Sequence, residues 1–157
     1  MTPKDFIAGH VTRAVAGPVW HADALDQILA DVTAAEAGAR PIPGAHNIAE
    51  LVAHVSVWAA IAERRLVGEN ANPTDEENFP TFSQPTDETW RSALQLLRER
   101  HASLSRAIAR LEENALYEPV AFRDYSVAYM LHGVVEHDAY HAGQIALLKK
   151  MVRLVSA

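Results

Sequence analysis

Apolar residues recur three and four positions apart in every long segment of this chain, the spacing of one face of an α-helix. The stretch that contains Leu51, Val55 and Trp58 shows the pattern clearly. No segment of useful length shows the two-residue alternation of a β-strand. A chain of 157 residues, 49% of them hydrophobic, can enclose one continuous core. We therefore expect an all-α fold in which residues 1–157 form a single domain.

Start and stop signals divide the chain into four helical parts. Gly17 and Pro18 should break the first part, because proline lacks a backbone donor. The apolar stripe, meaning the row of apolar residues along one helix face, should resume with Trp20 and Leu25. The segment from Glu69 to Pro85 is the only long irregular one. The expected parts are a broken arm over residues 3–37, a second helix from Ile48 to about Gly68, a third from Thr86 to near Asn114, and a fourth from Ser126 to about Arg153. This order predicts a four-helix bundle with a long crossover between the second and third helices.

The composition excludes several classes of protein. With 14 basic and 20 acidic residues the net charge is -6, so the positive surface of a nucleic-acid-binding protein is missing. The absence of cysteine rules out disulfides, thiolate metal sites and a cysteine nucleophile. No apolar run approaches the roughly 20 residues that span a membrane, and the N-terminus does not resemble a signal peptide. We expect a soluble cytoplasmic protein with no nucleic-acid or membrane partner.

Two histidines one turn apart are the clearest chemical signal. His137 and His141 lie about 40° apart on the fourth helix, and the apolar Met130 and Leu148 lie about 20° from His137 on the same side. Both rings should therefore point into the bundle. A lone buried histidine is usually an ordinary core residue with one hydrogen bond. Two such rings together favour a shared metal ion, because two charged imidazoles in a low dielectric repel each other.

His54 is the expected third ligand. It lies beside the stripe of Leu51, Trp58 and Ile61 on the second helix, at mid-helix depth. Three neutral imidazoles can bind zinc, nickel, iron or cobalt and leave a coordination position open for water, as in a catalytic site. A metal-free bundle with three core histidines is the structural alternative.

The other histidines are weaker candidates. His101 shares a stripe with apolar residues and should be a core residue, and His132 lies on the opposite side of its helix from His137. The remaining three lie near helix ends or breaks, where we expect solvent exposure: His10, His21 and His46.

Three further side chains could line the site or orient its ligands. Tyr140 and Gln144 lie within about 100° of both rings of the histidine pair. Glu50 lies one turn before His54 and could act as a general base, but a capping box with Asn47 explains it equally well. The catalytic residue itself stays unidentified.

Two segments resemble the DinB/YfiT-like metal-dependent hydrolases of the DinB superfamily. The segment from Leu131 to Ile145, LHGVVEHDAYHAGQI, resembles the C-terminal signature of these proteins. The segment from Pro43 to His54, PGAHNIAELVAH, resembles their second-helix motif, with Asn47 where the family often has serine. The order and spacing agree, and the resemblance covers nearly the whole chain.

The resemblance implies an up-down-down-up bundle, often a homodimer. It implies one divalent ion on His54, His137 and His141, with nickel or zinc first and iron, cobalt or manganese as further candidates. Related proteins are named as hydrolases, and some are transferases or isomerases that use a low-molecular-weight thiol. We therefore expect a hydrolase that activates water on a small-molecule substrate, with a thiol-dependent transferase or a non-catalytic, stress-associated metal-binding protein as alternatives.

Overall fold

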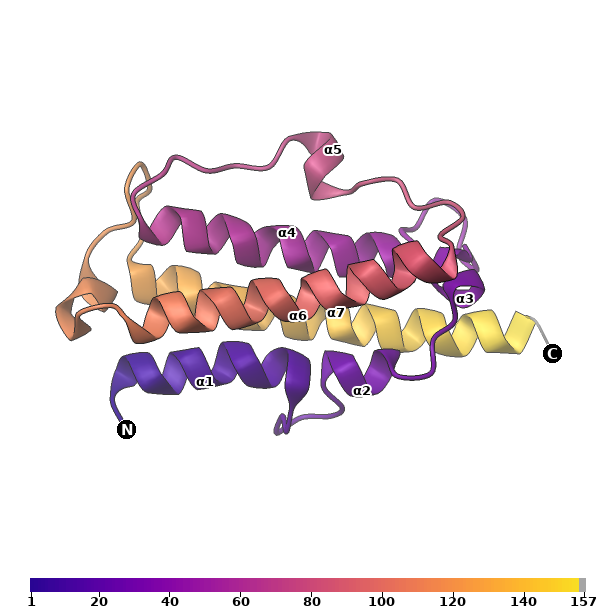
Figure 1. The fold of residues 1–157 in the computed structure, drawn as a ribbon, viewed down its shortest axis with the longest axis horizontal. Helices are drawn as coiled ribbons and strands as arrows, with labels where there is room; N and C mark the ends of the chain where they lie inside the picture. The colour runs from indigo at the N-terminus through magenta and orange to yellow at the C-terminus, as the bar shows by residue number, and fades with distance from the viewer. Residues whose placement is uncertain (156–157) are drawn as a thin grey trace.

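The computed structural model describes residues 1–155 and consists of helices packed side by side. The four long helices are α1 (Pro3–Ala16), α4 (Ile48–Leu66), α6 (Asp87–Ala109) and α7 (Val127–Val155). In Figure 1, α1 and α7 run in one direction, and α4 and α6 run in the other. This is the expected up-down-down-up arrangement, and the all-α bundle is confirmed.

The first arm is broken into three pieces. After α1, the peptide bond between Gly17 and Pro18 is cis, and Gly17 has a φ of 72°. The chain then forms two five-residue helices, α2 (Leu25–Leu29) and α3 (Ala34–Gly38). The prediction that Trp20 belongs to the apolar stripe is wrong, because this side chain is fully exposed in the loop before α2.

A capping box begins α4, the helix that carries the first candidate ligand. Oδ1 of Asn47 accepts a hydrogen bond of 2.9 Å from the backbone N–H of Glu50, and Oε2 of Glu50 accepts one of 3.2 Å from the backbone N–H of Asn47. The helix ends at Leu66, two residues before the predicted end at Gly68, where φ is 85°. The sequence thus predicted both ends of this helix closely.

The two remaining connections contain short helices that the sequence pattern did not predict. The crossover over residues 69–85 contains α5 (Asp75–Asn78), and Figure 1 shows it passing over α4. α6 ends at Ala109, earlier than the predicted Asn114, and the 3₁₀ helix η1 (Glu113–Tyr117) follows. Ser126 caps the start of α7 at Val127, since its Oγ accepts a hydrogen bond of 3.2 Å from the backbone N–H of Tyr129.

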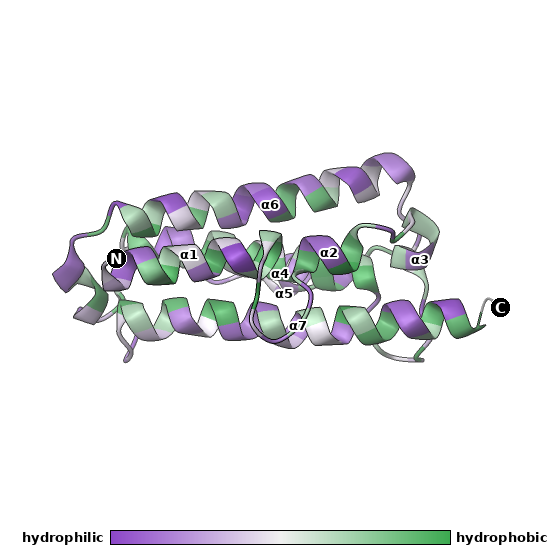
Figure 2. Cartoon of the chain, turned by 90° about the horizontal axis from the view of Figure 1, so that it is seen from below, coloured by the Kyte–Doolittle hydropathy of each residue, from purple (hydrophilic) through white to green (hydrophobic). Residues whose placement is uncertain are grey.

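The core divides into two apolar clusters, one toward each end of the bundle. On α7, Ile145 and Leu148 belong to one cluster, and Met130 and Leu131 belong to the other. The candidate metal ligands of α7 lie between these two groups. Figure 2 shows hydrophobic and hydrophilic residues alternating along each long helix, as expected when one face is buried. Within residues 1–155, no helix is both long and apolar enough to span a membrane.

Candidate metal centre

Three histidine side chains meet between α4 and α7. His54 comes from α4, and His137 and His141 lie one turn apart on α7. Nε2 of His137 lies 2.9 Å from Nε2 of His54 and 3.1 Å from Nε2 of His141. One ligand nitrogen from each ring lies within 4.8 Å of the other two. The fold thus brings together the three histidines that the sequence singled out.

Hydrogen bonds fix the orientation of two of these rings. Nδ1 of His54 lies 2.7 Å from the backbone carbonyl oxygen of Asn78, and Nδ1 of His141 lies 2.7 Å from Oε1 of Gln144. A carbonyl oxygen can only accept, so each Nδ1 carries a hydrogen and donates it. In the neutral ring the other nitrogen, Nε2, then presents a lone pair toward His137.

The second ring nitrogen of His137, Nδ1, is buried and makes no hydrogen bond among the described residues. Burial, followed by the nearby imidazoles of His141 and His54, lowers the pKa of His137 to about 3, so this ring is neutral at physiological pH. A hydrogen on Nε2 of His137 could bond to only one of the two Nε2 lone pairs that face it, those of His54 and His141. A cation could be bound by all three nitrogens.

Two of the three distances between the nitrogens, those from His137 to His54 and to His141, suit one shared metal ion. An imidazole nitrogen lies about 2.0–2.1 Å from a bound zinc ion, so two such nitrogens on neighbouring coordination positions are about 2.9–3.4 Å apart. The separations of 2.9 and 3.1 Å fall in this range. Burial also lowers the pKa of His54 and of His141, which favours their neutral form. In residues 1–155, no carboxylate joins the cluster, so the protein offers three donors.

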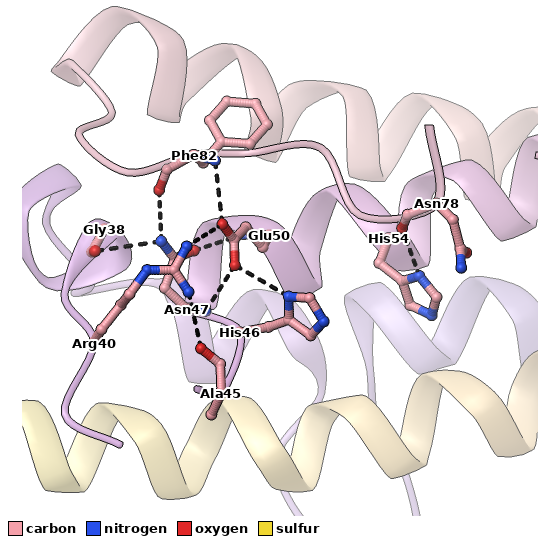
Figure 3. A network of polar contacts seen from close by, with 9 residues as sticks. All are labelled: Gly38, Arg40, Ala45, His46, Asn47, Glu50, His54, Asn78 and Phe82. Carbon is pink, nitrogen blue, oxygen red and sulfur yellow. Dashed lines mark hydrogen bonds and ion pairs between the residues drawn. The ribbon is translucent and has the colours of Figure 1, made fainter. Parts of the chain in front are cut away.

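The crossover braces the ring of His54 from outside the bundle. Asn78, whose carbonyl holds His54, also accepts a hydrogen bond of 2.8 Å from Nε1 of Trp58 through its side chain. The next residue, Phe79, stacks between two imidazoles, with ring centroids 4.0 Å from His54 and 3.8 Å from His46. Asn78 lies directly above His54 in Figure 3. The crossover therefore sets the orientation of one candidate ligand.

Glu50 anchors the same crossover at a second point (Figure 3). Its Oε1 accepts from the Arg40 guanidinium and from the backbone N–H of Phe82, and its Oε2 accepts from the backbone of Asn47 and lies 3.2 Å from Nδ1 of His46. Burial opposes ionisation of Glu50, but the Arg40 guanidinium, followed by the bonds from Asn47 and His46, holds its pKa below the ordinary value. Both oxygens are thus committed to a structural network, which accords with the capping-box interpretation.

The two α7 residues expected near the site differ in their contacts. Gln144 is half-buried and holds Nδ1 of His141. Tyr140 is 65% exposed, and its ring stands edge-on to His141 with the centroids 5.0 Å apart. Gln144 therefore orients a candidate ligand, whereas Tyr140 is an exposed neighbour of the same ring.

His101 is a core residue, as predicted, and it pairs with Asp138. Each is 1% exposed. Nδ1 of His101 lies 2.8 Å from the carbonyl oxygen of Leu97, and its Nε2 lies 3.2 Å from Oδ2 of Asp138. Burial opposes the charge on both groups, yet the pairing raises the pKa of His101, while burial raises the pKa of Asp138. The pair holds α6 against α7 immediately behind His137.

The remaining histidines lie outside the cluster. His132 and His21 are exposed, as expected. The prediction for His10 is wrong, since this residue is half-buried and its ring packs 4.2 Å from that of Phe6. The side chain of His46 is 45% exposed, as expected, and stacks on Phe79, which in turn stacks on His54.

A cavity of ≈370 Å³ adjoins the cluster. Its walls come from α4, from the connection before α7 and from the first half of α7: His54, Trp58, Ala62, Arg65, Tyr125, Tyr129, Met130, Gly133, Val134 and His137. Arg65 was not predicted from the sequence, although its position three turns after His54 puts both within about 20° on one helix face. Asn78 was not predicted either, because a segment without periodicity gives no signal for it.

Comparison with known proteins supports the resemblance seen in the motifs. The model of the DinB superfamily matches residues 19–145, a range that includes all three clustered histidines. Neither the curated proteins nor the solved structures gave a match. The family match covers most of the chain and is independent of the geometry of the histidine cluster. The chain therefore belongs to the DinB superfamily.

Proposed function

We propose that His54, His137 and His141 bind one divalent transition-metal ion and that the protein is a metal-dependent hydrolase of small molecules. The observation that carries this proposal is the convergence of three Nε2 atoms, two of them in rings whose Nδ1 hydrogens are already donated elsewhere. Nickel and zinc are the first candidates, because both accept imidazole nitrogen readily.

Two features favour catalysis over a purely structural metal site. The protein supplies three donors within residues 1–155, and structural zinc sites usually have four. The cavity next to His54 and His137 offers space for a substrate. A divalent ion with an open position lowers the pKa of a coordinated water toward neutrality and polarises a carbonyl oxygen.

The chain's own residues have defined parts in this proposal. Asn78 and Gln144 hold their rings in the tautomer that presents Nε2 to the ion. Trp58 forms a wall beside two ligands, with its ring 6.3 Å from His54 and 6.0 Å from His137. These side chains orient the ligands and screen them from bulk water.

Metal binding is tested first, by elemental analysis of protein purified without a chelator or a histidine tag. We expect about one equivalent of a divalent metal in the parent protein and a large loss in the His137→Ala variant, with helix content by circular dichroism unchanged. His132→Ala is the matched control, since His132 is an exposed histidine of the same helix. Full metal content in His137→Ala would refute the assignment.

Catalysis is tested with small esters and amides, using metal-free and reloaded protein. We expect turnover with water alone, and only in the reloaded protein. A rate that requires an added low-molecular-weight thiol would replace hydrolysis with thiol transfer. Stoichiometric metal that raises the unfolding temperature, without turnover under either condition, would favour a non-catalytic metal-binding protein.

A further inference from the structure

Arg65 lies in the wall of the cavity and has no acidic partner among the residues that the structure describes. It is 8% exposed, and none of the ion pairs among residues 1–155 includes it. Its three hydrogen bonds go to neutral acceptors: the carbonyl oxygen of Ala71 at 2.9 Å, Oδ1 of Asn72 at 3.1 Å and the Tyr125 hydroxyl at 3.2 Å. A buried cation without a counter-ion is unfavourable unless another group compensates it.

A second guanidinium increases the positive charge at this end of the cavity. Arg123 donates to Oδ1 of Asn72 at 2.8 Å and to the carbonyl oxygen of Ala71 at 3.3 Å, the same two acceptors that Arg65 uses. No acidic group in the described part of the chain forms an ion pair with Arg123 either. Two like charges are therefore held close together in a protein whose net charge is -6. An anion between or beside them would relieve this repulsion.

Donors at this end remain free for such an anion. A guanidinium has five N–H groups, and toward residues 1–155 Arg65 uses one on each of its three nitrogens, so each terminal nitrogen keeps one N–H. The Tyr125 hydroxyl accepts from Arg65, which leaves its own hydrogen for a ligand. Guanidinium N–H groups match the two oxygens of a carboxylate in geometry and charge.

Between Arg65 and the histidine cluster the cavity wall is mostly apolar. Trp58 lies between the two, with the Arg65 guanidinium carbon 5.5 Å from its ring centroid. Met130 and Val134 line the α7 side. Gly133 lies next to Val134, and a Cβ added there would meet no atom within 4 Å, so the missing side chain leaves open space. His54 and Arg65 are 11 residues apart on one helix, about 16 Å along its axis.

We propose that this cavity binds a substrate with an apolar body and a terminal carboxylate. The carboxylate pairs with Arg65, the body lies along Trp58 beside Gly133, and the opposite end of the molecule reaches the three histidines. This inference specifies the substrate class of the hydrolase proposed above and rests on that proposal for its chemistry, although binding of the carboxylate can be measured without metal.

The test is calorimetric titration with phenylbutyrate and with phenylbutyramide, its uncharged amide, on both metal-free and metal-loaded protein. We expect the acid to bind about ten- to a hundredfold more tightly than the amide in both forms, the range for a hydrogen bond to a charged group. Arg65→Met should abolish this preference. Arg123 still donates to Ala71 and Asn72 in that variant, so their oxygens keep a partner.

Arg64→Met is the matched control for charge. It removes one cation from the adjacent position of α4, where the exposed Arg64 pairs with Glu69. Gly133→Leu tests the apolar part independently of Arg65: it should lose binding of both probes while its helix propensity improves. Gly143→Leu is its control, because Gly143 lies on the same helix, is exposed and lines no part of the cavity.

The outcomes separate this inference from the proposed function. A preference for the acid that Arg65→Met abolishes supports the inference, even if the protein binds no metal and hydrolyses nothing. Equal binding of acid and amide by the parent protein would overturn it. So would a preference that appears only with metal and survives in Arg65→Met, since the carboxylate would then bind at the histidines.

Discussion

Replacing His101 with leucine should destabilise the protein strongly, although His101 is not one of the three clustered histidines. Its Nε2 is the only partner of Asp138 within residues 1–155, 3.2 Å from Oδ2, and Oδ1 of Asp138 already has none. Leucine fills a similar volume but cannot donate or accept a hydrogen bond. The variant therefore leaves a fully buried carboxyl group with no hydrogen bond.

The magnitude follows from the burial of the pair. Removing one partner of a buried ion pair costs about 3–5 kcal/mol, because the other charge stays buried and uncompensated. For a protein of this size each kcal/mol lowers the unfolding temperature by about 2–4 °C. We expect His101→Leu to lower it by about 6–20 °C. Changing Asp138 to valine as well removes the unpaired carboxyl group and should recover most of this loss.

The assay is urea unfolding followed by circular dichroism, with all variants in a chelator so that metal binding does not contribute. His101→Leu, Asp138→Val and the double variant form a mutant cycle. The sum of the two single losses should exceed the loss of the double variant by at least about 2 kcal/mol. A loss below about 1 kcal/mol in His101→Leu, or strictly additive losses, would refute the reasoning that the carboxyl group depends on this histidine.

Two further predictions concern the helix ends. Asn47→Ala removes the α4 cap and the bonds of Nδ2 to the carbonyl oxygens of Phe82 and Gly38, so it should cost about 2–4 kcal/mol in urea unfolding, and Asn47→Ser should restore only the cap. Hydrogen bonds from Lys149 and then Arg153 lower the pKa of Asp31 to about 2. The stabilisation of the folded state by ionised Asp31 is complete above the unfolded pKa near 4 and is lost as the pH falls toward 2. Asp31→Asn should therefore lower the unfolding temperature at pH 7 but not at pH 2. High salt should shrink the difference, since Asp31 is exposed.

Local geometry explains why much of the candidate site could be read from the sequence. Residues four apart on a helix share a face wherever the helix packs, so His137 and His141 had to point the same way. A capping box involves residues three apart, so Asn47 and Glu50 also indicated the start of α4 in the sequence. The apolar pattern gave a wrong prediction at Trp20, which lies exposed beside the break at Gly17. There the packing of the chain, and not the local spacing of apolar residues, decides which side chains are buried.

Contacts between distant residues could be decided only by the tertiary structure. The carbonyl of Asn78 reaches His54 across 24 positions, and Asp138 pairs with His101 across 37. No periodicity links such residues, because their contact depends on how the helices and the crossover pack. The same holds for Arg65, whose lack of an acidic neighbour is a property of its surroundings. The sequence thus determined which side chains share a helix face, and packing determined which partners those side chains meet.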